Sequence, residues 1–211
     1  MLSEKEIKKC AREAGFDRCG VAPSRPLEEH RSRFTEWLRG GFSSTLTYLE
    51  RNVEKRLDPS RLVAGAQSVI VCAVSYRNAI SGGYPEGWNG PKIASYACAR
   101  DYHDVIRGML LEMFERLRAA KPPLRGRVFV DTAPVLEKAW AVEAGLGWIG
   151  RNSLLVVPGL GSFVLLGELI VDSEVDRYDH PYCGTGCGSC WRCVESCPAG
   201  AIRSVRTLGS A

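Results

Sequence analysis

Ser68-Val-Ile-Val-Cys-Ala-Val74 is one of the two longest apolar runs of the chain, and its length and β-branched residues predict a buried strand. The other run, Ser162-Phe-Val-Leu-Leu166, predicts a strand that continues to Val171. Both runs are far shorter than the roughly 20 apolar residues of a membrane-spanning helix. Arg127-Val-Phe-Val-Asp131 predicts a further, short strand that ends in an acid.

Helical patterns alternate with these strands. Residues 27–39 and 135–144 are expected to be helices, and Leu62 to Ala66 is expected to close a short one. The best helix follows Asp104, its predicted N-cap, with an apolar stripe formed by Val105, Ile106, Met109, Leu110, Met113, Phe114 and Leu117. Ser3 and Glu6 predict a capping box for an N-terminal helix. The alternation favours a mixed α/β (α+β) layer.

Composition is that of a globular protein. The 211 residues suffice for one domain with a small appendage, and 45% hydrophobic with 25% charged residues exclude a disordered chain. The net charge of +4 alone identifies no partner. The first nine residues lack the apolar core of a secretory signal, so we expect a cytoplasmic protein without a membrane partner. An acidic linker, residues 172–179, predicts a main domain over 1–172 and a cysteine segment over 173–211.

Five of the nine cysteines lie between Cys183 and Cys197. Cys187, Cys190, Cys193 and Cys197, with Pro198, follow the C-x2-C-x2-C-x3-C-P spacing of bacterial [4Fe–4S] ferredoxins. In two-cluster ferredoxins the last cysteine binds the other cluster. A zinc knuckle fits less well, because zinc sites usually separate two close pairs. Cys183 is either an additional ligand or a free thiol, and the free thiol is favoured.

Asp131 stands between a predicted strand and a predicted helix. It is either a proton donor or, with Thr132, a helix cap, and spacing alone favours the cap. Three other motifs combine residue types that often bind ligands. One group either lines a pocket or forms a polar helix entry: Tyr96, Arg100, Tyr102 and His103. The pair Lys55-Arg56 either binds an anionic group or is solvated. Gly145-x-Gly-x-x-Gly150 follows a helix rather than a strand, so it is not a dinucleotide-binding fingerprint.

Together these motifs resemble those of epoxyqueuosine reductases, in the same order along the chain. The segments that carry the resemblance are Glu54-Lys-Arg-Leu-Asp-Pro59, Ser95-Tyr-Ala, Asp101-Tyr-His103, Val130-Asp-Thr-Ala-Pro-Val-Leu-Glu-Lys138, Gly145-Leu-Gly-Trp-Ile-Gly150, Leu166-Gly-Glu-Leu169 and the cysteine run with Pro198-Ala-Gly-Ala-Ile202. The resemblance implies reduction of epoxyqueuosine to queuosine in tRNA, with cobalamin and [4Fe–4S] clusters. It also implies a nitroreductase-like cobalamin-binding layer followed by a ferredoxin-like segment, here partial.

The resemblance also assigns roles to residues. Asp131 matches the proton donor, which reverses the weighting from spacing alone. Cys187, Cys190 and Cys193 match ligands of a first cluster, and Cys197 matches a ligand of a second. Arg56, Cys98 and the stretch near Leu155 are similar to cobalamin-contacting positions. The partners implied are the modified tRNA and an external electron donor.

Members of this family continue past Ile202 with a second cysteine motif and helical repeats, whereas 14 residues without cysteine follow Cys197 here. We therefore expect a C-terminally truncated chain with impaired turnover. The competing hypotheses are an iron–sulfur electron-transfer module without catalysis and a reductive dehalogenase, a class that usually carries an export signal.

Overall fold

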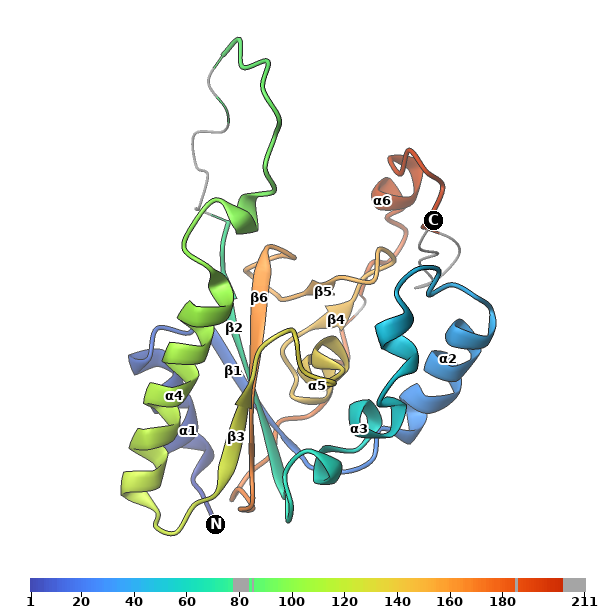
Figure 1. The fold of residues 1–211 in the computed structure, drawn as a ribbon. Coiled ribbons are helices and arrows are strands. Elements are labelled where there is room, and N and C mark those ends of the chain that lie inside the picture. Colours follow the sequence, from blue (N-terminus) through green and yellow to red (C-terminus); the bar gives the residue numbers. More distant parts are fainter. Residues whose placement is uncertain (78–83, 85, 185, 203–211) are drawn as a thin grey trace.

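A four-stranded antiparallel sheet organises the molecule (Figure 1), for which the computed structural model describes residues 1–77, 84, 86–184 and 186–202. Its strand order is β1-β2-β6-β3. The strands are β1 (Arg18–Pro23), β2 (Ser68–Ser75), β6 (Val164–Val171) and β3 (Gly126–Phe129). The two apolar runs thus become the central strands β2 and β6, which confirms a mixed α and β architecture.

Two helices cover one face of the sheet, α1 (Glu4–Glu13) and α4 (Tyr102–Ala120) (Figure 1). The predicted stripe of α4 is correct in its centre, because Ile106, Leu110, Met113, Phe114 and Leu117 are all buried. Gly167 of β6 lets α4 approach closely, since a Cβ there would lie 2.6 Å from Ile106.

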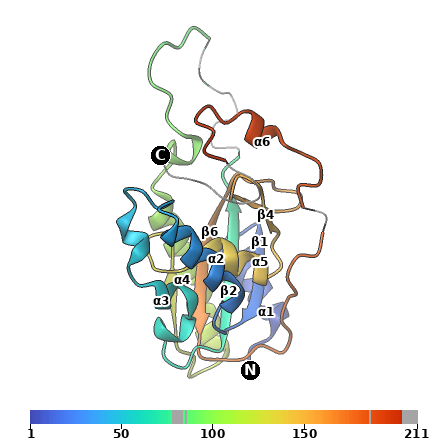
Figure 2. The same ribbon diagram turned by 90° about the vertical axis from the view of Figure 1, so that its right-hand side faces the viewer.

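The opposite face of the sheet carries α5 (Glu137–Glu143), whose Trp140 is fully buried between the helix and the strands. A two-stranded hairpin, β4 (Trp148–Ile149) and β5 (Leu155–Val156), follows α5. Farther out lie α2 (Glu28–Arg39), α3 (Val53–Leu57) and the short 3₁₀ turns η1 (Thr47–Glu50) and η2 (Pro59–Arg61) (Figure 2). This face therefore has two layers of helix outside the sheet, and the candidate site lies between them.

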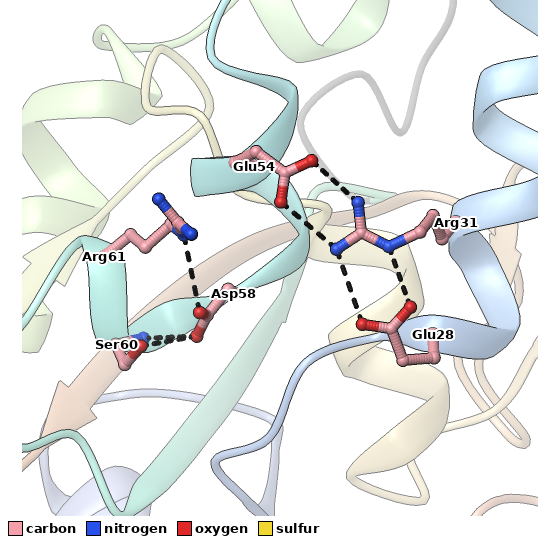
Figure 3. A network of polar contacts seen from close by, with 6 residues as sticks. All are labelled: Glu28, Arg31, Glu54, Asp58, Ser60 and Arg61. Atoms are coloured by element: carbon pink, nitrogen blue, oxygen red, sulfur yellow. Dashed lines mark hydrogen bonds and ion pairs between the residues drawn. The ribbon is translucent and has the colours of Figure 1, made fainter.

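An ion-pair network joins α2 to α3 (Figure 3). Arg31 contacts Glu28 at 2.7 Å and Glu54 at 2.7 Å. Asp58 accepts hydrogen bonds from the backbone and side chain of Ser60, which caps η2. These groups are largely exposed, so the network sets the position of α2 more than it adds to stability.

The cysteine segment follows β6 and ends, in the described part of the chain, near α6 (Arg192–Glu195). The residues that connect β6 to the cysteines contact the sheet layer at two points. Asp179 accepts a hydrogen bond from the Val21 amide at 2.9 Å, and Tyr182 stacks on Trp148. Arg151 of the β4–β5 loop donates to the carbonyls of Cys190 and Gly188, at 3.1 and 2.9 Å. None of the described helices is both long and apolar enough to cross a membrane.

Several expected element ends were wrong. Ser3 makes no capping bond through its side chain, and the Glu4 amide instead donates to Asp176, 172 positions away. Helix α4 is capped by Asp101, whose side chain accepts from the His103 amide, and not by Asp104. The short helix that residues 62–66 were expected to close ends earlier, with the turn η2 at Arg61.

Candidate functional site

A cavity of about 540 Å³ lies between α5 and the outer helices. One wall is apolar and aromatic, with Phe34 and Trp37 of α2 and Phe42 after it. The other wall is formed by the segment from Asp131 into α5 and by the β4–β5 hairpin, with Ile149 and Ser153. A flat, largely apolar ligand with a few polar groups suits such a cavity.

Asp131 lies at this cavity just beyond the end of β3, as the sequence predicted. Its backbone is left-handed, with φ of 49°, a conformation that Asp and Asn adopt more readily than most residues. The N-cap of α5 is Leu136, and α5 has no side-chain capping bond, so Asp131 and Thr132 do not cap it. The carboxyl of Asp131 is exposed rather than half-buried.

Two groups from the start of α4 bind the same oxygen of Asp131. The Tyr102 hydroxyl donates to Oδ2 at 2.5 Å, and His103 Nε2 lies 3.2 Å from it. His103 Nδ1 in turn lies 2.8 Å from Asp101. The hydrogen bonds to Asp101 and Asp131 raise the pKa of His103, which favours the imidazolium. Burial and the bond to Asp131 raise the pKa of Tyr102, so its proton stays on the hydroxyl.

Of the four predicted pocket residues, the structure brings Tyr102 and His103 to Asp131. Tyr96 contacts Tyr102 edge-on and is itself largely exposed, and Arg100 lies outside the cavity described above. The prediction of a polar helix entry is thus incomplete. Asp101, Tyr102 and His103 do form the start of α4, but Tyr102 and His103 also contact Asp131.

Glu137 is a site residue that the sequence analysis missed. Its Oε1 accepts the Asp131 amide at 2.5 Å, and its side chain lines the cavity. Burial raises the pKa of Glu137 to about 7, with a further contribution from the nearby Asp131 charge. This carboxyl therefore exchanges its proton near neutral pH.

Two cations face the same cavity. Arg56 donates to the Tyr48 carbonyl at 3.3 Å, while its buried Nε has no hydrogen-bond partner among the described residues. Lys138 donates to the Ser153 carbonyl at 2.7 Å. Burial lowers the pKa of both side chains. A buried guanidinium nitrogen without a partner is unfavourable, so the Arg56 site favours a ligand that accepts a hydrogen bond there.

The remaining residues predicted to contact cobalamin lie outside the cavity lining. Leu155 is buried in the core beneath α5. Cys98 follows the 3₁₀ turn η3 (Ser95–Ala97), is exposed, and points its thiol at the Ala94 carbonyl, 3.5 Å away.

The four cysteines of the predicted motif lie along the turns around α6. Hydrogen bonds from backbone amides at residues 199–202, first among them Ile202 and Ala201, lower the pKa of Cys197 and favour its thiolate. In the part of the chain that the structure describes, no three His, Cys, Asp or Glu side chains converge as a closed metal site. Thiol groups are the donors that iron–sulfur clusters use, so the side chains present suit such a cluster in their chemistry. The Cys183 thiol is exposed and contacts the Pro181 carbonyl, and whether it is an additional ligand or a free thiol stays a prediction.

Comparisons with known proteins point to one family. The family described as "Epoxyqueuosine reductase QueG, DUF1730" matches residues 56–132, a range that holds Arg56 and Asp131. An epoxyqueuosine reductase of Cyclobacterium marinum is 44% identical over 201 residues, which is 93% of this chain and 62% of that protein.

Solved structures agree. Epoxyqueuosine reductase from Streptococcus thermophilus superposes with a TM-score of 0.91 at 26% identity, over 99% of this chain and 56% of that one. An epoxyqueuosine reductase bound to an epoxyqueuosine-modified tRNA-Tyr stem loop gives a TM-score of 0.83 at 27% identity, over 98% and 54% of the two chains. A reductive dehalogenase shares the fold at 16% identity and a TM-score of 0.59. The chain thus spans a little more than half the length of the solved reductases.

Proposed function

Because this chain belongs to the epoxyqueuosine reductase family, we propose that it carries the catalytic layer of an enzyme that reduces epoxyqueuosine to queuosine in tRNA. The observation that carries the proposal is the position of Asp131. Its carboxyl lies at an aromatic-walled cavity, where the Tyr102 hydroxyl holds it in place and His103 can supply a proton.

The cavity fits cobalamin in its chemistry. The aromatic wall of α2 suits the face of a corrin ring, and the unpartnered Nε of Arg56 suits one of the amide or phosphate oxygens that the cofactor carries. Lys138 offers a second cation at the same cavity. When bound, cobalamin supplies the electrons that break the carbon–oxygen bond of the epoxide.

Asp131 acts as the general acid of this reaction. An alkoxide is a poor leaving group, so a proton delivered to the epoxide oxygen as the bond breaks accelerates the step by roughly 10²–10⁴-fold. His103 is the natural source of the replacement proton, because its Nε2 lies 3.2 Å from Oδ2 and its pKa is raised. Asp101 holds the imidazole in place through Nδ1.

We assign Cys187, Cys190 and Cys193 to a first [4Fe–4S] cluster and Cys197 to a second, as their spacing suggests. Arg151 supports this assignment, since its bonds to the carbonyls of Cys190 and Gly188 tie the cysteine segment to the hairpin that lines the cavity. These hydrogen bonds keep the proposed clusters, which donate electrons, close to the cavity that would hold cobalamin. We further propose that electrons come from an external donor, that the modified tRNA is the substrate, and that the reaction takes place in the cytoplasm.

Titration of the anaerobically reconstituted protein with cobalamin tests the proposal, followed by an assay of epoxide reduction on a modified tRNA stem loop. We expect a saturable change in the cobalamin spectrum and formation of queuosine, at a rate reduced by the truncation. Asp131→Asn should retain cobalamin binding and lose about 10²–10⁴-fold in kcat. The matched control is Asp104→Asn. Asp104 is an exposed acid at the third residue of α4, the helix that carries Tyr102 and His103, and this variant should leave kcat unchanged.

Two outcomes would contradict the proposal. A flat cobalamin titration removes the cofactor assignment, and native activity in Asp131→Asn removes the proton-donor role. A reducible cluster without any epoxide reduction would instead support the electron-transfer module.

A further inference from the structure

Four lysine and arginine side chains line another cavity, of about 420 Å³, at the edge of the sheet. They come from four different elements: Lys55 of α3, Arg61 of η2, Arg107 of α4 and Arg127 of β3. Strand β3 is an edge strand, and in Figure 1 it runs between α4 and α3. The fold therefore gathers, in one cavity, positive charges that lie far apart in the sequence.

This cationic cavity adjoins the candidate site. Residues 132–134 line it, whereas Asp131, directly before them, lines the cavity described above. Lys55 and its neighbour Arg56 divide in the same way, one at each cavity. His103 lines the cationic cavity, and its Nε2 lies 3.2 Å from Oδ2 of Asp131. A group bound among the cations would thus lie next to the proposed general acid.

Little negative charge balances these cations. Among the described residues, the only acid of the lining is Asp104, which is exposed and would oppose an anion. Arg61 lies 3.6 Å from Asp58 (Figure 3). Lys55 and Arg107 form no ion pair within the part of the chain that the structure describes. Like charges that share a cavity repel one another, and a bound anion removes this repulsion.

The guanidinium of Arg127 is held in position at this cavity. Its Nη1 donates to the Leu62 carbonyl at 3.1 Å, and its Cζ lies 5.2 Å from the centre of the Phe129 ring. Leu62 and Phe129 line the same cavity. A guanidinium that is fixed in this way loses little freedom when it binds a ligand, and its remaining N–H groups form a fork that suits phosphate oxygens.

We propose that the cationic cavity binds a backbone phosphate of the tRNA, next to the nucleotide that is reduced. The proposal rests on the proposed function, which supplies the tRNA. A nucleic-acid strand carries a phosphate on each side of an internal nucleotide, so a phosphate bound here would bring the adjoining base within reach of Asp131. Such a contact positions the substrate and reads no base, because the phosphates are alike in every sequence.

Fluorescence anisotropy of a labelled, unmodified tRNA stem loop tests the site in the reconstituted 211-residue chain, at several salt concentrations and in phosphate-free buffer. Arg107→Gln and Lys55→Gln each remove an exposed cation that has no ion pair among the described residues, so both variants should fold. We expect each variant to weaken binding about tenfold and to make the slope of log K against log salt shallower by about 0.7–1.

Arg118→Gln is the matched control. It removes an exposed arginine about three turns farther along α4, outside the cationic cavity, and should leave the affinity and the slope native. No binding of the stem loop by the native chain, or native binding in both cavity variants, would overturn the inference. An equal change in Arg118→Gln would also overturn it, because the attraction would then come from the overall charge.

Cobalamin carries a phosphate too, and a spectral titration separates this source from the tRNA. The affinity for cobalamin should be native in Arg107→Gln and Lys55→Gln. Weaker cobalamin binding with native RNA binding would assign the cavity to the cofactor and overturn the inference. RNA binding is measured without turnover, so its outcome is independent of the reaction. A chain that binds the stem loop through Arg107 but reduces no epoxide would contradict the proposed function and keep the phosphate site.

Discussion

Glu137→Gln should make the protein more stable above pH 6, although it removes a carboxyl from the candidate site. Burial and the Asp131 charge move the pKa of Glu137 from 4.5 to about 7. Between these values the folded chain retains a proton that the unfolded chain has lost, so the native free energy of unfolding falls as pH rises. A raised carboxyl pKa thus costs stability at high pH and none below the unfolded value.

The size of this loss follows from the shift. From 4.5 to about 7 is about 2.5 units, and at ~1.36 kcal/mol per unit the native chain loses about 3 kcal/mol relative to the variant by pH 7. Above pH 7 the difference stays constant. The variant retains the bond from the Asp131 amide, because the glutamine carbonyl accepts it as Glu137 Oε1 does.

Urea unfolding at pH 5, 6, 7 and 8 measures this difference directly. Glu115→Gln is the control, because Glu115 is exposed and pairs only with Arg118 three positions along the same helix. Its pH dependence should match that of the native chain. If the native protein and Glu137→Gln lose stability in parallel from pH 5 to pH 8, Glu137 does not hold a proton in the folded state and the reasoning is refuted.

Arg56→Gln should weaken cobalamin binding about tenfold or more in a spectral titration. Arg51→Gln, which alters an exposed arginine outside the cavity, should leave the affinity unchanged. Equal affinities of the two variants would remove Arg56 from the site. Arg151→Gln should lower the iron content reached on reconstitution and speed proteolysis of the cysteine segment, because two hydrogen bonds and the stacking on Trp191 are lost; unchanged iron and cleavage would contradict the proposed tie. Gly20→Ala should destabilise the fold by about 1–3 kcal/mol or more in urea unfolding, since the new Cβ would lie 2.0 Å from a backbone oxygen of α5's C-cap, Ala144; native stability would show that α5 can shift away.

The central strands and the main helices could be predicted from sequence because their apolar periodicity reflects local burial. The start of α4 could not be placed correctly, since two acids, Asp101 and Asp104, offer equally good caps and only the tertiary position of Tyr102 and His103 selects the first. The N-terminus of α1 shows the same limit, because its partner Asp176 lies near the other end of the chain.

Within the candidate site, Asp131 could be found because an acid directly after an apolar strand is visible in the sequence. Glu168 lies in the Leu166-Gly-Glu-Leu169 segment that carries the resemblance, as a single acid inside an apolar run, and the structure buries it completely. Glu137 left none, since glutamate is common in the first turn of a helix and only the folded chain shows that it accepts the Asp131 amide. The predicted roles of Cys98 and of the stretch near Leu155 remain predictions; Cys98 and Leu155 lie outside the cavity lining, whereas Ser153 of that stretch lies in it.

The wall formed by α2 has a practical consequence for redesign. All twelve residues of α2 are described and none is buried, and polar pairs join the helix to its neighbours, Arg31 to Glu54 of α3 and His30 to Glu143 of α5. Asp131, on the opposite wall of the cavity, has a left-handed backbone conformation, so few other residue types fit at this position. A library that seeks to accommodate a bulkier corrinoid should therefore diversify the aromatic side chains of α2 and leave the loop after β3 untouched.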